Sequence, residues 1–194
     1  AHALSPRAGD TVFFAPPDAA ALPDPIDTLA SLFQEPPAPG AVFSNGRVVD
    51  EERRPLGYDL WDSLWFSAAE RAAVRGGRAV EVFVKHVVAA GTTLAFRGLY
   101  KPLILPFPEL HDCHDAWVSF LITAVSGVPI VERNLIDYRL HGSNQFGLRR
   151  FNLVEQLGKA REQLAKNIFD HNVRFFTTAR ERLRTQRDAR FQAP

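Results

Sequence analysis

The stretch from Gly91 to Gly147 organises this chain, and it reads GTTLAFRGLYKPLILPFPELHDCHDAWVSFLITAVSGVPIVERNLIDYRLHGSNQFG. At its centre lies the run HDCHDAW, residues 111–117, in which five of the seven residues can bind a metal ion or transfer a proton. A second polar run, YRLHGSN at residues 138–144, follows one expected helix and two short apolar runs. We expect any chemistry to occur where these two runs converge.

The composition is that of a soluble globular protein with room for one domain and a helical appendage. The chain has 194 residues, of which 46% are hydrophobic and 23% are charged. Cys113 is the only cysteine, so the chain can form neither an intrachain disulfide nor a zinc site built from several thiolates. The sequence shows no secretory signal peptide, no methionine and no apolar run near the roughly 20 residues that span a bilayer. These features favour a cytoplasmic location and an N-terminus that is processed or preceded by further sequence.

The charge is distributed unevenly along the chain. Between Arg149 and Arg190, eleven Lys and Arg residues stand against five Asp and Glu, so this segment carries +6 and the rest −5. The net charge of +1 gives no overall attraction to nucleic acid. The basic segment could contact anionic membrane lipid, a phosphorylated acceptor or nucleic acid, most attractively at Arg174-Phe175-Phe176. The interspersed acids favour the alternative, a solvated helix face.

Hydrophobic periodicity and turn residues predict alternating short strands and helices. Three prolines make residues 15–24 a loop, Asp24 can cap the following helix, and Ser67 with Glu70 forms a capping box. In chain order we expect a strand at 11–14, a helix from Pro25 to Phe33, strand pieces at 41–44 and 48–49 around an Asn45-Gly46 turn, two helical pieces within 58–75, a helix at 79–90 (whose valines would also suit a strand), a strand at 92–96 and an extended segment at 103–108. We then expect a helix at 113–126, strands at 128–131 and 135–138, and a helix from 150 to about 184 with its leucines and Ile168 inward and its arginines outward.

The helix expected at 113–126 places His114 and Asp115 in its first turn. There the unpaired backbone N–H groups and the positive end of the helix dipole favour an ionised carboxylate. Asp115 is therefore a candidate general base or metal ligand. The alternative is that the aspartate only caps the helix and that the neighbouring histidines are solvated.

Two further residues are candidates by position alone. His141 lies in a turn directly after the strand expected at 135–138, and functional sites gather at strand ends. Asp18 is an isolated carboxylate in the proline-rich loop. The alternatives are an inert loop histidine and a solvated turn residue, respectively.

Four motifs carry a family resemblance: FSN…VVD at 43–50, GTTLAFR at 91–97, HDAW at 114–117, and LI-x-YR-x-HG-x-N-x-x-G at 135–147. Their order and spacing resemble the C-terminal, acceptor half of a bacterial family-2 glycosyltransferase of the GT-A fold. The branch that builds surface polysaccharide and lipopolysaccharide is the most similar. The opening GDTVFF, residues 9–14, resembles the strand that precedes the metal motif in that family.

The resemblance implies a metal-dependent, inverting transfer of a sugar from a nucleotide-sugar to a saccharide or lipid-linked acceptor, with Mn²⁺ or Mg²⁺ as cofactor and no nucleic-acid partner. It implies that Asp115 is the general base and that Arg139 could hold a phosphate. It also implies that the protein acts in the cytoplasm or at the inner face of the membrane. The implied site residues are, for substrate binding, His114, Trp117, Thr92, Arg139 and Asn144, and, for metal binding, Asp18 and His141.

The chain departs from the family in its donor half. The opening strand–helix units that hold the nucleotide are missing, and the family's Asp-x-Asp motif is altered to APPDA at 15–19. The expected fold is α/β, a partial GT-A (Rossmann-like) mixed sheet flanked by helices. The expected domains are a glycosyltransferase-like core at 1–148 and a basic helical extension at 149–194.

Two other functions stay open. The altered metal loop and the missing nucleotide half favour a catalytically inactive, glycosyltransferase-like module that binds a glycan or a partner chain. A third possibility is a metal phosphohydrolase that uses His111, His114 and Asp115. Such enzymes are all-helical, so the strands expected on both sides of the cluster place this possibility last.

Overall fold

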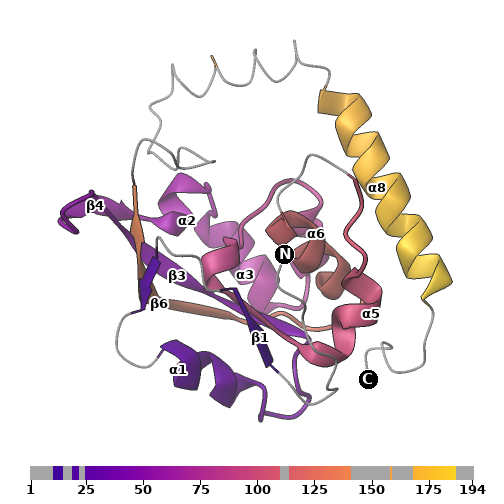
Figure 1. Ribbon diagram of the computed structural model, residues 1–194, viewed down its shortest axis with the longest axis horizontal. Coiled ribbons are helices and arrows are strands. Elements are labelled where there is room, and N and C mark those ends of the chain that lie inside the picture. Colours follow the sequence, from indigo (N-terminus) through magenta and orange to yellow (C-terminus); the bar gives the residue numbers. More distant parts are fainter. Residues whose placement is uncertain are drawn as a thin grey trace.

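The computed structural model describes residues 11–14, 19–21, 25–109, 114–140, 158 and 168–186, which form a mixed sheet flanked by helices (Figure 1). The expected α/β class is therefore confirmed. The strand order is β1-β5-β3-β6-β2, β4 pairs with β3, and the central pair β3–β6 is parallel while the other pairs are antiparallel. The strands are β1 (Thr11–Phe13), β2 (Ala19–Ala21), β3 (Ala41–Val49), β4 (Pro55–Asp59), β5 (Leu94–Arg97) and β6 (Ile130–Arg139).

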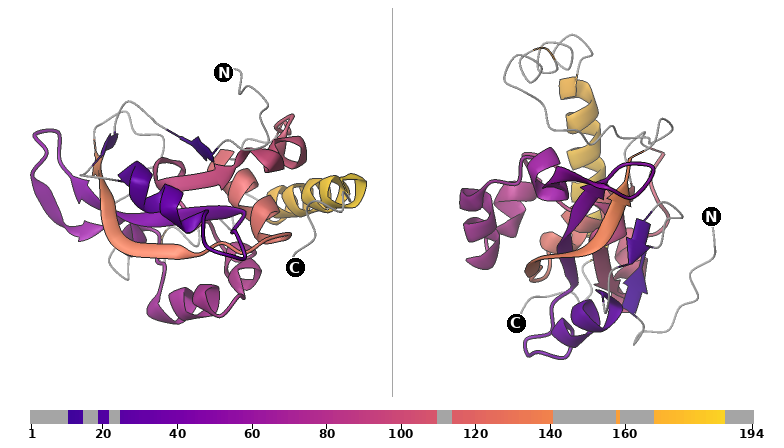
Figure 2. Two further views of the ribbon diagram at one scale, coloured as in Figure 1. Left: turned by 90° about the horizontal axis from the view of Figure 1, so that it is seen from below. Right: turned by 90° about the vertical axis from the view of Figure 1, so that its left-hand side faces the viewer.

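Helices cover both faces of this sheet (Figure 2). The described helices are α1 (Pro25–Leu32), α2 (Leu60–Ser63), α3 (Ala68–Arg75), α4 (Ala79–Phe83), α5 (Lys101–Ile104), α6 (His114–Thr123) and α8 (Ile168–Thr185), with 3₁₀ turns η1 (Gly91–Thr93) and η2 (Gly98–Tyr100). Successive residues of β3 point to opposite faces: Phe43 joins the cluster built with α3, α4 and α6, and Val42 joins the cluster built with α1.

β3 is one continuous strand, so the turn expected at Asn45-Gly46 is wrong. The glycine serves packing instead: a Cβ at Gly46 would lie 2.7 Å from Leu60 Cδ1 and 2.8 Å from Ile136 Cγ1. The pairing with β6 shifts register on both sides of Asn45, as at a β-bulge. A glycine inside a strand therefore marks a bulge and a close approach here.

β6 is likewise one strand, where two were expected. The polar residues in its middle do not break it because their side chains reach helices at the two faces. Glu132 forms an ion pair with Arg75 of α3, and Arg133 donates a hydrogen bond of 2.8 Å to Thr28 Oγ1 of α1. Residues 19–21, expected within a loop, form β2 and pair with β6.

Several helix predictions are confirmed. α1 begins at Pro25, although its expected cap Asp24 lies outside the described residues. The reciprocal capping box of Ser67 and Glu70 opens α3, which ends at Gly76. The helix expected at 113–126 is α6, described from His114 to Thr123.

Three boundaries differ from expectation. The helix expected at 79–90 ends at Phe83, and the strand expected at 92–96 begins only at Leu94 because residues 91–93 form η1. The segment expected to be extended at 103–108 starts inside α5. Pro102, directly before that segment, stands in the first turn of α5, where a missing N–H costs nothing.

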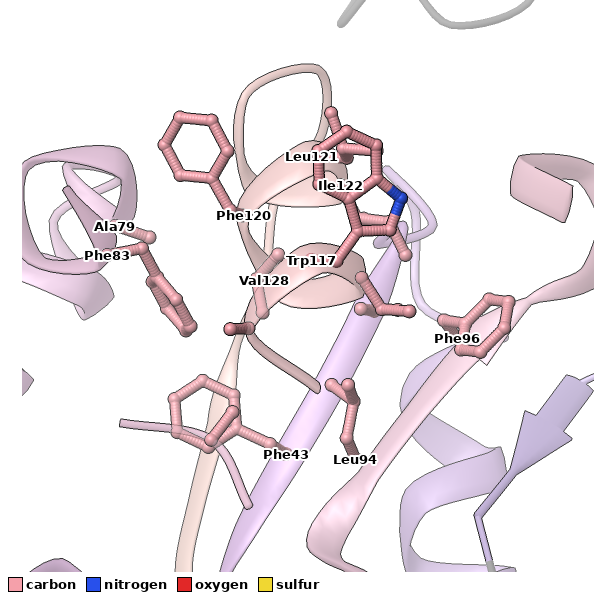
Figure 3. Packing of buried hydrophobic residues seen from close by; sticks show 14 of the residues in the cluster. Phe43, Ala79, Phe83, Leu94, Phe96, Trp117, Phe120, Leu121, Ile122 and Val128 are labelled. Carbon is pink, nitrogen blue, oxygen red and sulfur yellow. The ribbon is translucent and has the colours of Figure 1, made fainter. Parts of the chain in front are cut away.

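The main core lies between the sheet and α6 (Figure 3). Trp117, Leu121 and Ile122 are at most 2% exposed, and Phe43 of β3 lies beneath them in the same cluster. α8 extends this core because Phe175 stacks edge-on against Trp117, with ring centroids 5.8 Å apart. Both halves of the expected division at 148 thus share one cluster among the described residues.

α8 confirms a helix at the end of the expected 150–184 segment, and residues 150–157 and 159–167 lie outside the described part. One of its arginines contradicts the expected outward orientation. Arg182 points inward, with its guanidinium carbon 5.5 Å from the centroid of the Trp117 ring. Within the described ranges, no helix has both the length and the apolar character needed to cross a bilayer.

Candidate functional site

The carboxylate of Asp115 is held at the start of α6 by two backbone N–H groups. Gly91 N–H donates to Oδ2 at 2.9 Å, and Ala116 N–H donates to Oδ1 at 2.9 Å. A carboxylate oxygen can accept two hydrogen bonds, so each oxygen keeps capacity for another donor beyond those among the described residues. Asp115 is partly exposed. The arrangement therefore presents an oriented carboxylate that solvent or a ligand can reach.

Local structure explains why Gly91 N–H points at this carboxylate. Ala90 has extended backbone angles, and its carbonyl accepts hydrogen bonds from Thr93 N–H and Thr93 Oγ1, which closes the turn η1. The N–H at the start of that turn has no partner within it and is left to bond with Asp115. A Cβ at Gly91 would be in ordinary contact with Asp115, 3.5 Å from its Cβ and 3.6 Å from Oδ2. The turn η1 therefore supplies a hydrogen-bond donor, and a residue with a Cβ would also fit at position 91.

His114 lies next to Asp115 in the first turn and is exposed. Its ring packs edge-on against Phe107, with centroids 4.6 Å apart. Phe107 comes from the segment after α5 and is partly buried against the main core. An exposed imidazole held by an aromatic ring can donate or accept a hydrogen bond beside the Asp115 carboxylate.

Thr92 lies in η1, one residue after the donor Gly91. Its Oγ1 is buried and has no hydrogen-bond partner among the described residues. A buried hydroxyl without a partner costs about 1–3 kcal/mol. Thr92 thus directly follows the residue whose N–H binds the candidate base, and its hydroxyl has no partner among the described residues.

Trp117 was expected to line the acceptor side, but its side chain belongs to the core. The residue is 2% exposed. Its indole N–H donates to the Ile104 carbonyl at 3.0 Å. The burial gives the acceptor role no support and makes Trp117 a packing residue of α6.

The end of β6 lies near η1. Ala90, directly before η1, packs in the same cluster as Tyr138 and Leu140, and η1 contacts both β3 and β6. Arg139 is half-buried at the end of β6, opposite Val49 of β3. The structure therefore brings the described part of the second polar run toward the first. Asp18, His141 and Asn144 lie outside the described residues, as do His111, Asp112 and Cys113.

An ion pair next to Arg139 was not anticipated from the sequence. Arg47 of β3 donates through Nε and Nη2 to the two carboxylate oxygens of Asp137 at 2.8 and 2.9 Å. The hydrogen bond and the charge of Asp137 raise the pKa of Arg47 above its usual value. The two residues oppose each other in the β3–β6 register, which only the parallel pairing of these strands reveals. The pair fixes this end of the sheet.

Both expected metal ligands, Asp18 and His141, lie outside the described residues. Among these, no group of three or more His, Cys, Asp or Glu side chains is placed to hold a metal ion. Asp18 and His141 alone would offer one carboxylate and one imidazole. A hard divalent cation usually takes more oxygen donors than that from a protein. Asp18 and His141 by themselves thus do not make a complete Mn²⁺ or Mg²⁺ site.

No protein-family model matches the chain, and no curated protein sequence does. The resemblance to family-2 glycosyltransferases therefore rests on the chain's own motifs.

Proposed function

We propose that this protein is a glycosyltransferase that moves a sugar from a nucleotide-sugar to a saccharide or lipid-linked acceptor with inversion, in the synthesis of cell-surface polysaccharide. The observation that carries the proposal is the Asp115 carboxylate, oriented by two backbone N–H groups at a helix start and still able to accept another hydrogen bond. General-base catalysis requires a carboxylate in that condition.

Asp115 would act on the acceptor hydroxyl. As the hydroxyl oxygen attacks the anomeric carbon, its proton passes to the carboxylate, and the bond from the anomeric carbon to the diphosphate oxygen breaks. The electron pair of that bond leaves with the nucleoside diphosphate, so attack from the opposite face inverts the configuration. The hydrogen bonds from Gly91 and Ala116 keep the carboxylate in place before the transfer.

The other proposed roles follow from position. His114, exposed beside Asp115, and Thr92 in η1 would bind the acceptor, while Arg139 at the end of β6 would hold a phosphate of the donor. Asn144 is proposed as a further substrate contact, and Asp18 and His141 as ligands of a divalent cation. No step above depends on that cation.

A peripheral contact with the inner face of the membrane remains part of the proposal. Phe175 and Phe176, expected at such an interface, pack in the core instead. Arg174 and Arg180 are exposed on α8, and Val173 is 64% exposed. A lipid-linked acceptor would be held at such a surface. Asp170 and Glu181 lie on the same helix and weaken its attraction to anionic lipid.

The proposal is tested with the purified chain, a panel of nucleotide-sugars, Mn²⁺ or Mg²⁺, and saccharide and lipid-linked acceptors. We expect donor-dependent sugar transfer that the Asp115→Asn variant loses. Asp27→Asn is the matched control because Asp27 is an exposed aspartate in the first turn of α1. Full turnover by Asp115→Asn would remove Asp115 from the role of base.

An inactive, glycosyltransferase-like binding module is the second candidate. It is favoured by the altered Asp-x-Asp motif at 15–19 and by the hydrogen bond from Gly91 N–H through which Asp115 joins η1 to α6, since a purely structural carboxylate would accept the same bond. Calorimetry with a nucleoside diphosphate and Mn²⁺ separates the two functions, because an inactive module without a donor site shows no heat of binding. A phosphohydrolase would cleave phosphate esters without any sugar donor, and the mixed sheet disfavours it.

A further inference from the structure

Arg182 of α8 binds the segment that carries Phe107. Its Nη1 donates to the Leu103 carbonyl at 3.0 Å, and its Nη2 donates to the Pro106 carbonyl at 2.8 Å. The guanidinium also lies over the Trp117 ring, as in a cation–π contact. One carbonyl group within α5 and one just after it are thus held by a residue that lies more than 70 positions later in the chain.

The bond to Pro106 acts directly on Phe107. The carbonyl of residue 106 and the N–H of residue 107 belong to one planar peptide unit, so a donor that fixes the first also restricts the second. Phe107 in turn packs against His114, the residue before Asp115. A continuous set of contacts therefore runs from α8 to the candidate site.

The chemistry of arginine suits this role. A planar guanidinium presents several donors in a fixed geometry and can stack on an aromatic ring, whereas an ammonium is a single flexible point charge. Burial lowers the pKa of the Arg182 guanidinium from its usual value, and an arginine still remains charged near neutral pH. The other described arginines of α8, Arg174, Arg180 and Arg184, are exposed.

We propose that Arg182 is a positioning residue of the candidate site: by clamping the Leu103 and Pro106 carbonyls, it holds Phe107 against His114 beside Asp115. Because the clamp comes from α8, the packing of α8 against the core is required to place His114 correctly beside Asp115. The consequence for turnover rests on the proposed function of Asp115. The clamp itself is a claim about geometry and can be tested without any turnover.

The test uses the ring-proton resonances of His114 in nuclear magnetic resonance spectra of the full chain. The ring of Phe107, 4.6 Å away, shifts these resonances. The chain has 6 histidines, and His114→Gln assigns the signal. Arg182→Met keeps an apolar stem over Trp117 and removes both donors. Arg184→Met is the matched control on the exposed face of the same helix.

We expect Arg182→Met to move the His114 resonances toward those of an unpacked histidine, and Arg184→Met to leave them in place. A folded Arg182→Met variant with unchanged His114 resonances overturns the proposal, and so does an equal change in both variants. If Arg182→Met does not fold, Arg182→Lys, which keeps the charge but cannot span both carbonyls, decides in the same way.

Turnover provides the second measurement. If the chain transfers sugar, Arg182→Met is expected to lower kcat/KM for the acceptor by roughly tenfold to a hundredfold, as a small displacement of a site does, while Arg184→Met retains the wild-type value. If the wild-type chain shows no transfer, the proposed function fails, and the His114 resonances still decide whether the clamp exists.

Discussion

The backbone N–H of Gly91 donates a hydrogen bond of 2.9 Å to Oδ2 of Asp115, joining two segments that are 24 residues apart in the chain. One partner opens the turn η1, and the other lies in the first turn of α6. The bond sets the direction of the carboxylate without using all of its acceptor capacity. The candidate site is thus built from two local structures: η1 supplies the Gly91 N–H as donor, and the first turn of α6 supplies the Asp115 carboxylate as acceptor.

Gly91→Pro removes the Gly91 donor. Its ring Cδ takes the place of the amide hydrogen that points at Oδ2, so the Asp115 carboxylate must turn away. Ala90, with φ −74° and ψ 139°, already has the extended angles that a residue before proline needs. We expect this variant to unfold in urea with a free energy about 1–3 kcal/mol or more below wild type, because a hydrogen bond to a charged group is lost and the carboxylate is displaced.

Gly91→Ala is the matched control for that change. It keeps the N–H, and its Cβ would be in ordinary contact with Asp115. We expect its free energy of unfolding to stay within about 0.5 kcal/mol of wild type. Equal losses of unfolding free energy in the two variants would mean that the stability depends on the absence of a side chain at residue 91 and not on its N–H donor.

A substitution at Gly46 tests whether the neighbours of β3 need the space that this glycine leaves. Gly46→Ala would drive a Cβ to within 2.8 Å of side-chain atoms of Leu60 and Ile136. Overpacking of this kind lowers the free energy of unfolding by about 1–3 kcal/mol. Gly127→Ala, where a Cβ would meet nothing within 4 Å, is the control in the same urea titrations. A neutral Gly46→Ala would show that β3 and its neighbours can move apart.

Glu70 is expected to contribute acid sensitivity. Burial, the largest single cause, raises its pKa, but hydrogen bonds from His86 and Ser67 and the charge of His86 together outweigh it and lower the pKa below the ordinary 4.5. A carboxyl with a lowered folded pKa stabilises the fold above its unfolded pKa, and this contribution is lost as the pH falls through the folded pKa.

The measurement is thermal unfolding between neutral pH and pH values below 4.5. Wild type is expected to lose melting temperature more steeply than Glu70→Gln as the pH falls below that value. Glu35→Gln, on the exposed connection after α1, should follow the wild-type curve. Parallel curves for wild type and Glu70→Gln would contradict the pKa lowering.

Local signals in the sequence were sufficient for the parts of the fold that local chemistry determines. The capping box at Ser67, the start of α1 at Pro25 and the helix that carries Asp115 follow from short-range rules, and each is observed. The orientation of Asp115 in a first helical turn was therefore predictable. Its bond to Gly91 was not, because that contact depends on how η1 and α6 pack.

Errors arose where tertiary contacts override local preference. Asn45-Gly46 has turn composition, yet Leu60 and Ile136 need the space above the glycine. Glu132 and Arg133 look like a break between strands, yet each finds a partner on a flanking helix. Arg182 reads as a solvated charge, yet two carbonyls and an indole surround it. None of these partners is near in sequence, so no local pattern could indicate them.

The most direct test of the central claim separates donor binding from chemistry in the Asp115→Asn variant. If Asp115 is the base, kcat for sugar transfer falls roughly a hundredfold to ten-thousandfold, the range for a general base, while the Kd for the nucleotide-sugar, measured by calorimetry, stays at the wild-type value. Urea unfolding of the variant checks that it is folded under assay conditions, since its amide group must face one of the two N–H donors. A folded Asp115→Asn chain with wild-type kcat would contradict the account.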